Sequence, residues 1–212
     1  EGRVLEATLL AAGPVGAGQR PSDGKSPGPP LVRDQRVSAL QAELDKLGVP
    51  YTGCDAQASR IGFDKVLTKQ ACLAAGVPTA RFEVIESPNA SWPMGWNPPV
   101  ILKPACQGSS VGLQCVERVG DWGAALAEAF RHGDKILMEE KVAGRECTVG
   151  ILDEQTLPII EVRPKVGFYD YKTKYTPGAT DYACPAPFEE AVAERVRAAA
   201  LEYGTAFENP GT

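Results

Sequence analysis

One short segment carries residue types that could bind phosphate. Residues Lys103 to Gly112, KPACQGSSVG, place a lysine, two glycines and two adjacent serines directly after the apolar run VIL. Mobile backbone N–H groups and small hydroxyls can wrap a polyphosphate, and the lysine adds a fixed positive charge. A glycine-rich hairpin turn explains the same composition, because strands are expected on both sides. The composition favours neither interpretation, but it excludes the P-loop pattern, whose lysine follows the glycines and opens a helix.

Further charged residues could complete such a site. The run MEEKVAGRE places Glu139, Glu140 and Glu146 around a strand end and a tight turn. Carboxylates there could accept hydrogen bonds from a ribose or an exocyclic amine. Lys65, near the start of an expected helix, is a second cation that could meet a phosphate. Solvated surface residues explain the same charges, and for Lys65 taken alone that simpler explanation is favoured.

The overall composition excludes several other functions. The 212 residues carry a net charge of -5, without a basic stripe, so nucleic acid is not an expected partner. No apolar run reaches the roughly 18 residues that a membrane span needs. The six cysteines form no C-x-x-C pair, so we expect no metal framework. The single histidine, His132, lies where a helix is expected to end, so we do not expect Ser-His catalysis. We expect the scattered cysteines to be reduced and buried, where they act as small hydrophobic side chains, as in proteins of a reducing cytoplasm.

These residues must be positioned by a mixed set of helices and strands. Helical periods and caps, including Asp64 as an N-cap, predict helices at 37–47, 64–75, 121–130 and from about 188 onward. Alternating or apolar runs predict strands at 80–86, 100–103, 112–117, 135–142, 146–153 and 157–164. We expect 51–59 to be a turn-rich connection. The order strand, glycine loop, strand, helix, strand favours an α+β fold over a doubly wound parallel sheet.

Four blocks of the sequence resemble a known family. The blocks are YTGCDAQASRIGFDKVLTKQACLAAGVPTARF, VILKPACQGSSVGLQCV, ILMEEKVAGRECTVGIL and FYDYKTKYTPGATDYACPAP. In this order they resemble successive parts of D-alanine–D-alanine ligase, an ATP-grasp enzyme, from about Leu40 to Glu202. The resemblance implies an α+β ATP-grasp fold. It implies a central subdomain at 64–140, part of a C-terminal subdomain with a lid loop at 141–212, a remnant of the N-terminal domain and linker at 37–63, and an unrelated or disordered segment at 1–36.

The resemblance also implies roles for individual residues. Those implied to bind ATP are Lys65 and Lys103 at the phosphates, Ser109 and Ser110 in the glycine loop, Glu139 and Val142 at the adenine, and Glu146 at the ribose. Those implied to act in catalysis are Ser109, close to substrate and γ-phosphate, and two lid residues, with Lys174 directed toward the phosphate and Tyr175 toward Ser109.

The family joins two D-alanines with ATP and Mg²⁺ through an acyl phosphate, supplies peptidoglycan precursors, and tends to form homodimers. The segments that carry its first-substrate glutamate and its metal-binding carboxylates have no match in this sequence, so we assign no metal ligand. We therefore expect a truncated or variant ligase with little turnover of its own. Two alternatives stay open: another ATP-grasp ligase with a different acceptor, such as D-lactate or D-serine, and a non-catalytic nucleotide-binding remnant or partner module.

Overall fold

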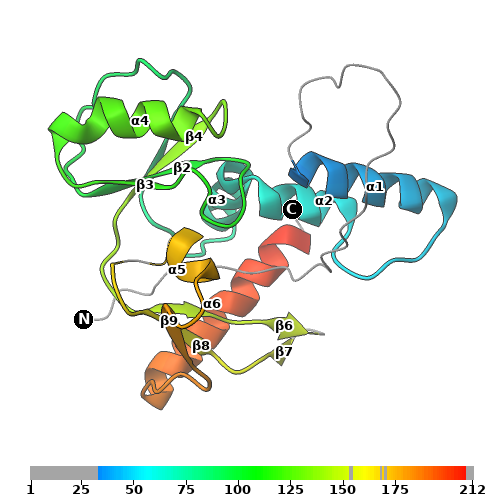
Figure 1. The fold of residues 1–212 in the computed structure, drawn as a ribbon. Helices are drawn as coiled ribbons and strands as arrows, with labels where there is room; N and C mark the ends of the chain where they lie inside the picture. The colour runs from blue at the N-terminus through cyan, green and yellow to red at the C-terminus, as the bar shows by residue number, and fades with distance from the viewer. Residues whose placement is uncertain (1–32, 153–154, 168, 170, 209–212) are drawn as a thin grey trace.

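The computed structural model describes residues 33–152, 155–167, 169 and 171–208, so most of the predicted N-terminal segment 1–36 lies outside the described residues. The helices are α1 (Arg33–Leu47), α2 (Ala56–Phe63), α3 (Lys65–Ala74), α4 (Trp122–Phe130), α5 (Tyr171–Tyr175) and α6 (Glu190–Glu208). The strands are β1 (Phe82–Ile85), β2 (Val100–Pro104), β3 (Gln114–Val116), β4 (Ile136–Glu140), β5 (Glu146–Thr148), β6 (Ile151–Leu152), β7 (Gln155–Thr156), β8 (Ile160–Pro164) and β9 (Thr180–Ala183). Figure 1 shows their arrangement.

A four-stranded antiparallel sheet forms the first half of the fold. Its strand order is β1-β4-β2-β3, and β2 and β3 are the two arms of the hairpin that contains the glycine segment. The register places Ile101 opposite Glu139 and Lys103 opposite Leu137. Because side chains alternate along a strand, these four residues share one face of the sheet, and their chain neighbours share the other.

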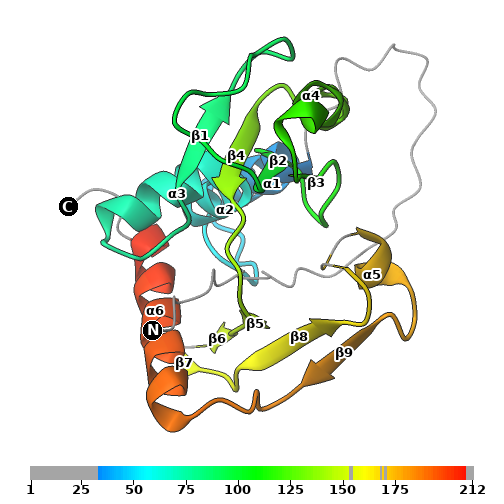
Figure 2. The ribbon, with the colours of Figure 1, turned by 90° about the vertical axis from the view of Figure 1, so that its left-hand side faces the viewer.

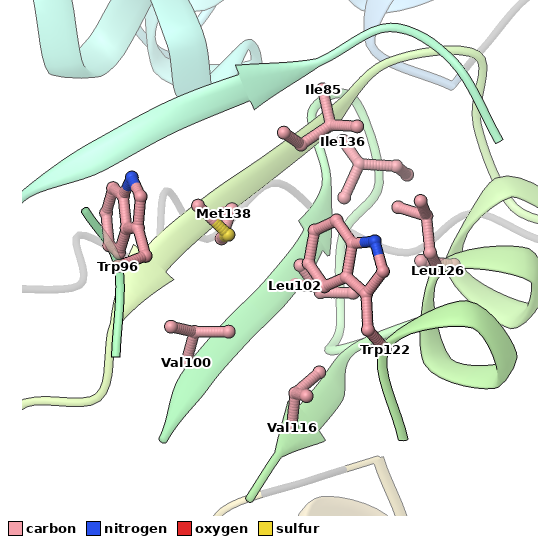
Figure 3. Packing of buried hydrophobic residues seen from close by; sticks show 10 residues of the cluster. Ile85, Trp96, Val100, Leu102, Val116, Trp122, Leu126, Ile136 and Met138 are labelled. Carbon is pink, nitrogen blue, oxygen red and sulfur yellow. The ribbon is translucent and has the colours of Figure 1, made fainter. Parts of the chain in front are cut away.

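The other face forms the main hydrophobic core. Val100, Leu102, Ile136 and Met138 pack there against the buried face of α4, which contributes Trp122, Leu126 and Ala129. Figure 3 shows Trp122 and Leu126 directed at the strands. The predicted amphipathic helix at 121–130 is therefore confirmed, and its apolar stripe is what holds the sheet.

Helix α3 packs near the opposite face of the sheet. Its start is fixed by Asp64, whose carboxylate accepts from the backbone N–H groups of Val66 and Leu67, as the N-cap prediction required. Val66 packs with Ala105 and Leu137 in a second, smaller core. The face that carries Lys103 and Glu139 therefore lies toward α3 rather than toward α4.

A second antiparallel sheet, of order β5-β8-β9, forms the rest of the fold and packs on α6. A cluster of buried side chains joins them: Cys147, Val149, Ile159, Ala193, Val196 and Ala200. Residues 165–179 connect β8 to β9 and contain α5, which lies between the two sheets (Figure 2). We call this connection the lid segment. No helix among the described residues is long and apolar enough to span a bilayer.

Several sequence predictions were wrong in detail. The expected connection at 51–59 contains the start of α2, which Asp55 caps by accepting from Ala58 N–H at 2.7 Å. The expected strand at 146–153 is two strands, because residues up to Thr148 pair with β8 whereas those from Ile151 pair with β7. Strand β9 was not predicted. Of the six cysteines only Cys72 and Cys147 are buried, so the expectation of buried thiols holds for two.

Candidate functional site

The glycine segment closes the β2–β3 hairpin in a left-handed backbone conformation. Ser109 and Ser110 have φ values of 57° and 58°, and Gly112 has 73°. Such values are uncommon for residues other than glycine and occur at sites where the surrounding structure fixes the backbone. A Cβ atom at Gly112 would lie 2.8 Å from His132 Cβ and from Pro104 Cγ, so only glycine fits there. The fold is therefore compatible with both interpretations of the composition. The segment connects two strands of a hairpin, as the turn interpretation requires, and its backbone is held in an unusual conformation, as a phosphate-binding loop would be.

Side-chain hydrogen bonds of Gln107, within the loop, and of Lys65, outside it, hold the loop in place. Gln107 Nε2 donates to the carbonyl of His132 at 2.8 Å. Lys65 Nζ donates to the carbonyls of Gln107 at 2.5 Å and Pro104 at 3.1 Å, and the backbone N–H of Lys65 donates to Ala105 at 3.0 Å. The Lys65 ammonium thus lies at the base of the glycine loop, beside the residue that follows Lys103. Its role at a phosphate stays a prediction.

A buried charged cluster lies behind the loop. Glu139 has only 1% of its surface exposed, and its two carboxylate oxygens contact Lys69 Nζ and Lys103 Nζ, one each. Burial raises the pKa of Glu139, but the charges of Lys103 and Lys69 outweigh it, so the pKa lies below its usual range and the group is ionised. Hydrogen bonds from the same two ammonium groups add to this lowering. The carboxylate is therefore enclosed by its two lysine partners.

Sequence reasoning overlooks Lys69. It lies on α3 between the buried residues Val66 and Cys72, at spacings of three, and is 3% exposed. Its Nζ also donates to Thr79 Oγ1 at 2.6 Å and Ala80 O at 3.4 Å. Lysine is rarely buried unless paired, so a lysine within an apolar helical stripe is the signal that identifies it.

The lid segment reaches the glycine loop. Tyr175 Oη donates to Ser109 Oγ at 2.7 Å, while half of the Tyr175 side chain stays exposed. Lys174 Nζ lies 5.7 Å from the centroid of the Tyr169 ring. The hydroxyls of Tyr169 and Tyr182 are 3.1 Å apart, so the lid segment also contacts β9. Hence the two lid residues predicted from the sequence lie in the segment that closes on the loop.

The remaining predicted residues follow β4. Val142 is half-buried in the turn after β4, and Glu146 begins β5 with an exposed side chain. Burial raises the pKa of Tyr169 first of all, and the hydrogen bond with Tyr182 and the negative charges of Tyr182 and Glu146 add to this effect.

The described residues contain no cluster suited to a metal ion. Within residues 33–208, apart from the few positions left undescribed there, no three His, Cys, Asp or Glu side chains gather in a way that could hold a metal ion. His132 contacts Glu128 through Nε2 at 3.2 Å and packs on the glycine loop. The described residues therefore do not fit the Mg²⁺ ions that the resemblance implies.

Comparisons with known proteins agree on one family. The family model described as "D-ala D-ala ligase C-terminus" matches residues 72–211. A D-alanine–D-alanine ligase of Syntrophotalea carbinolica is 44% identical over 151 residues, which are 71% of this chain and 50% of that protein. The crystal structure of D-alanine–D-alanine ligase from Bacillus anthracis has a TM-score of 0.68 at 28% identity, covering 80% of this chain and 56% of the other. The same enzyme complexed with ATP has a TM-score of 0.64 at 26% identity, covering 80% and 55%.

These matches cover most of this chain but a smaller share of each relative. This chain spans about half the length of the curated relatives that it matches. The solved structures likewise extend well beyond the matched region. The part that the family model matches, residues 72–211, nevertheless contains the glycine loop, the lid segment, and Lys103 and Glu139 of the buried charged cluster, whereas Lys69 precedes it.

Proposed function

This chain belongs to the D-alanine–D-alanine ligase family, and we propose that it acts in the ATP-dependent joining of two D-alanines for peptidoglycan precursor synthesis, in the cytoplasm. The family is shown by the comparisons, whereas the activity is our proposal, because the chain spans about half the length of its relatives. Support for the nucleotide comes from the printed title of one similar structure, which is complexed with ATP.

In the proposed site, different residues bind different parts of the nucleotide. Lys103 and Lys65 bind the phosphates, the backbone of Ser109 and Ser110 surrounds these phosphates, and Lys174 approaches them from the lid segment. Glu139 and Val142 face the adenine, and Glu146 faces the ribose. Phosphoryl transfer depends on alignment and charge neutralisation more than on a side-chain nucleophile, which suits a site built from lysines and backbone.

The proposed reaction has two steps. A carboxylate oxygen of the first D-alanine attacks the γ-phosphorus of ATP, the bond to the ADP oxygen breaks, and an acyl phosphate forms. The amine of the second D-alanine then attacks the acyl carbon, the C–O bond to phosphate breaks, and the amine loses a proton. The acyl phosphate must be protected from water between the steps. A closing lid provides that protection.

One observation carries the proposal: the hydrogen bond from Tyr175 to Ser109. The two residues are 66 positions apart, and their contact brings the lid segment onto the loop that we assign to the γ-phosphate. An ordinary hairpin turn needs no such partner. A lid that meets the phosphate loop is what a ligase with a hydrolysable intermediate requires.

The test combines binding with turnover in the full 212-residue chain. We expect ATP to raise the melting temperature, and D-alanine to stimulate ADP formation above the rate with ATP alone. D-lactate and D-serine serve as alternative acceptors, and stimulation by either in place of D-alanine would assign a different acceptor. ATP binding without any stimulated ADP formation would reduce the chain to a nucleotide-binding module. The absence of both would overturn the proposal.

A further inference from the structure

The buried charged cluster contains a lysine for which the proposed reaction has no direct use. Lys69 contacts Glu139 Oε1, and Lys103 contacts Oε2. The side chains of Lys69, Glu139 and Lys103 are 4%, 2% and 20% exposed, so the chain of charges runs from the interior outward. Lys103 is the member that can meet a ligand.

Stability alone does not explain a buried lysine at this position. Removing two charges from water is expensive, and well-packed apolar residues often replace a buried ion pair without loss of stability. Position 69 lies between the buried residues Val66 and Cys72 on one face of α3, so the packing of the helix itself requires no charge there. The ammonium also makes hydrogen bonds to Thr79 and Ala80, which fix its location closely.

We propose that Lys69 is a positioning residue for the nucleotide: it holds one oxygen of Glu139, so that Glu139 shares its charge between two lysines and Lys103 keeps more of its own charge for the triphosphate. This inference rests on the proposed function, because it requires a nucleotide at Lys103. Without Lys69 the carboxylate turns wholly to Lys103. Lys103 then forms a closed one-to-one pair, and its attraction for phosphate falls.

The rival explanation is that Lys69 only neutralises Glu139 within the core. The two explanations differ in their effect on ligands. A structural role predicts a lower melting temperature of the unliganded protein, with ATP and adenosine affected equally. A positioning role predicts a selective loss of affinity for the phosphates, because adenosine has none to meet Lys103.

The experiment measures ATP and adenosine affinities by titration calorimetry in the parent chain, in Lys69→Met, and in the double variant Lys69→Met, Glu139→Gln. Circular dichroism checks that each is folded. We expect Lys69→Met to lower the ratio of ATP to adenosine affinity at least tenfold. The double variant, in which residue 139 no longer carries a charge that pairs with Lys103, is expected to restore the ratio to within about threefold. Lys46→Ala, on the distant helix α1, is the matched control and leaves the ratio unchanged.

Every other outcome contradicts either the positioning role of Lys69 or the proposed function. An unchanged ratio in a folded Lys69→Met variant, or no recovery in the double variant, would overturn the positioning role while ATP binding by the parent stands. If Lys69→Met does not fold, Lys69→Gln replaces it, because the amide keeps donors for Thr79 and Glu139. Failure of both variants to fold would show that the role is structural. A parent chain that binds no ATP would contradict the proposed function itself, and the inference with it.

Discussion

Tyr175 donates a hydrogen bond to Ser109 at 2.7 Å, from one end of the lid segment to the centre of the glycine loop. Ser109 has a positive φ of 57°, so its hydroxyl is presented by a backbone that the hairpin holds in place. The lid residue, by contrast, is more than half exposed. The contact therefore joins a fixed partner to an accessible one, which is the arrangement expected of a latch.

Removing the Tyr175 hydroxyl is expected to loosen the lid segment. A hydrogen bond of this kind contributes about 1 kcal/mol, or roughly a fivefold change in the ratio of closed to open lid. Limited trypsin digestion of Tyr175→Phe should therefore cut within residues 165–179 about five times faster than in the parent, with ATP present. The melting temperature should change little, since the side chain is largely exposed.

Tyr51→Phe is the control for this digestion, because Tyr51 lies in the connection between α1 and α2, away from the lid segment. It should be cut at the parental rate. Equal digestion of Tyr175→Phe and the parent would mean that the hydroxyl contact does not hold the lid.

A methyl group at Gly112 is expected to displace the glycine loop. The added Cβ would meet His132 and Pro104 at 2.8 Å, and the positive φ adds strain. Together these effects should cost about 2 to 3 kcal/mol, which lowers the melting temperature by roughly 5 to 10 °C. Gly108→Ala is the matched control, because nothing lies within 4 Å of its added Cβ. Similar melting temperatures for the two variants would refute the close packing of the loop on His132.

Glu161 is expected to give the protein a stability that depends on acid pH. Its carboxylate accepts from Arg145 Nε at 2.6 Å and Nη2 at 2.7 Å, and from Arg163 Nε at 2.8 Å. The hydrogen bonds from Arg145 are the main cause that lowers the pKa of Glu161 to about 2. Because this pKa lies below the value of roughly 4.3 in an unfolded chain, the stabilisation is fully present above about pH 5 and is lost as the pH falls toward 2.

Glu161→Gln should therefore lower the free energy of unfolding by about 2 to 3 kcal/mol at pH 7. The difference from the parent should shrink steadily between pH 5 and pH 2, as urea titrations can measure. Glu190→Gln removes a carboxylate whose side chain is 73% exposed and should have little effect at any pH. A difference between Glu161→Gln and the parent that stays constant down to pH 2 would contradict the lowered pKa.

Much of the fold was predictable because local signals and tertiary packing agree. The stripe of α4, the N-cap at Asp64 and the β2–β3 hairpin each follow from residue type and spacing. Helix α2 was missed because it is short and follows a turn-rich sequence, so the cap at Asp55 is its one strong local signal. Strand β9 was missed because it is held by pairing with β8 across the lid segment, which no local pattern reveals.

The sequence indicated individual candidate residues of the site, but not the contacts between them. The resemblance pointed to Lys103, Ser109 and Tyr175, whose roles stay predictions, but it did not indicate that Glu139 is buried between two lysines. That arrangement depends on the packing of α3 near β4, where Val66 and Leu137 share a core, which brings Lys69 to a residue 70 positions away. Long-range charge pairing of this kind depends on the folded structure, not on spacing along the chain.

The most direct test of the account is the ATP affinity of Lys103→Ala beside that of the parent and of Lys46→Ala. Charge-assisted contacts of a lysine with phosphate contribute about 1.5 to 3 kcal/mol, so we predict a roughly 10- to 100-fold loss for Lys103→Ala. The ATP-dependent rise in melting temperature should shrink accordingly, while Lys46→Ala matches the parent. A parent that shows no ATP-dependent shift, or a Lys103→Ala variant that binds ATP as tightly as the parent, would contradict the claim that this strand end and its loop hold a triphosphate.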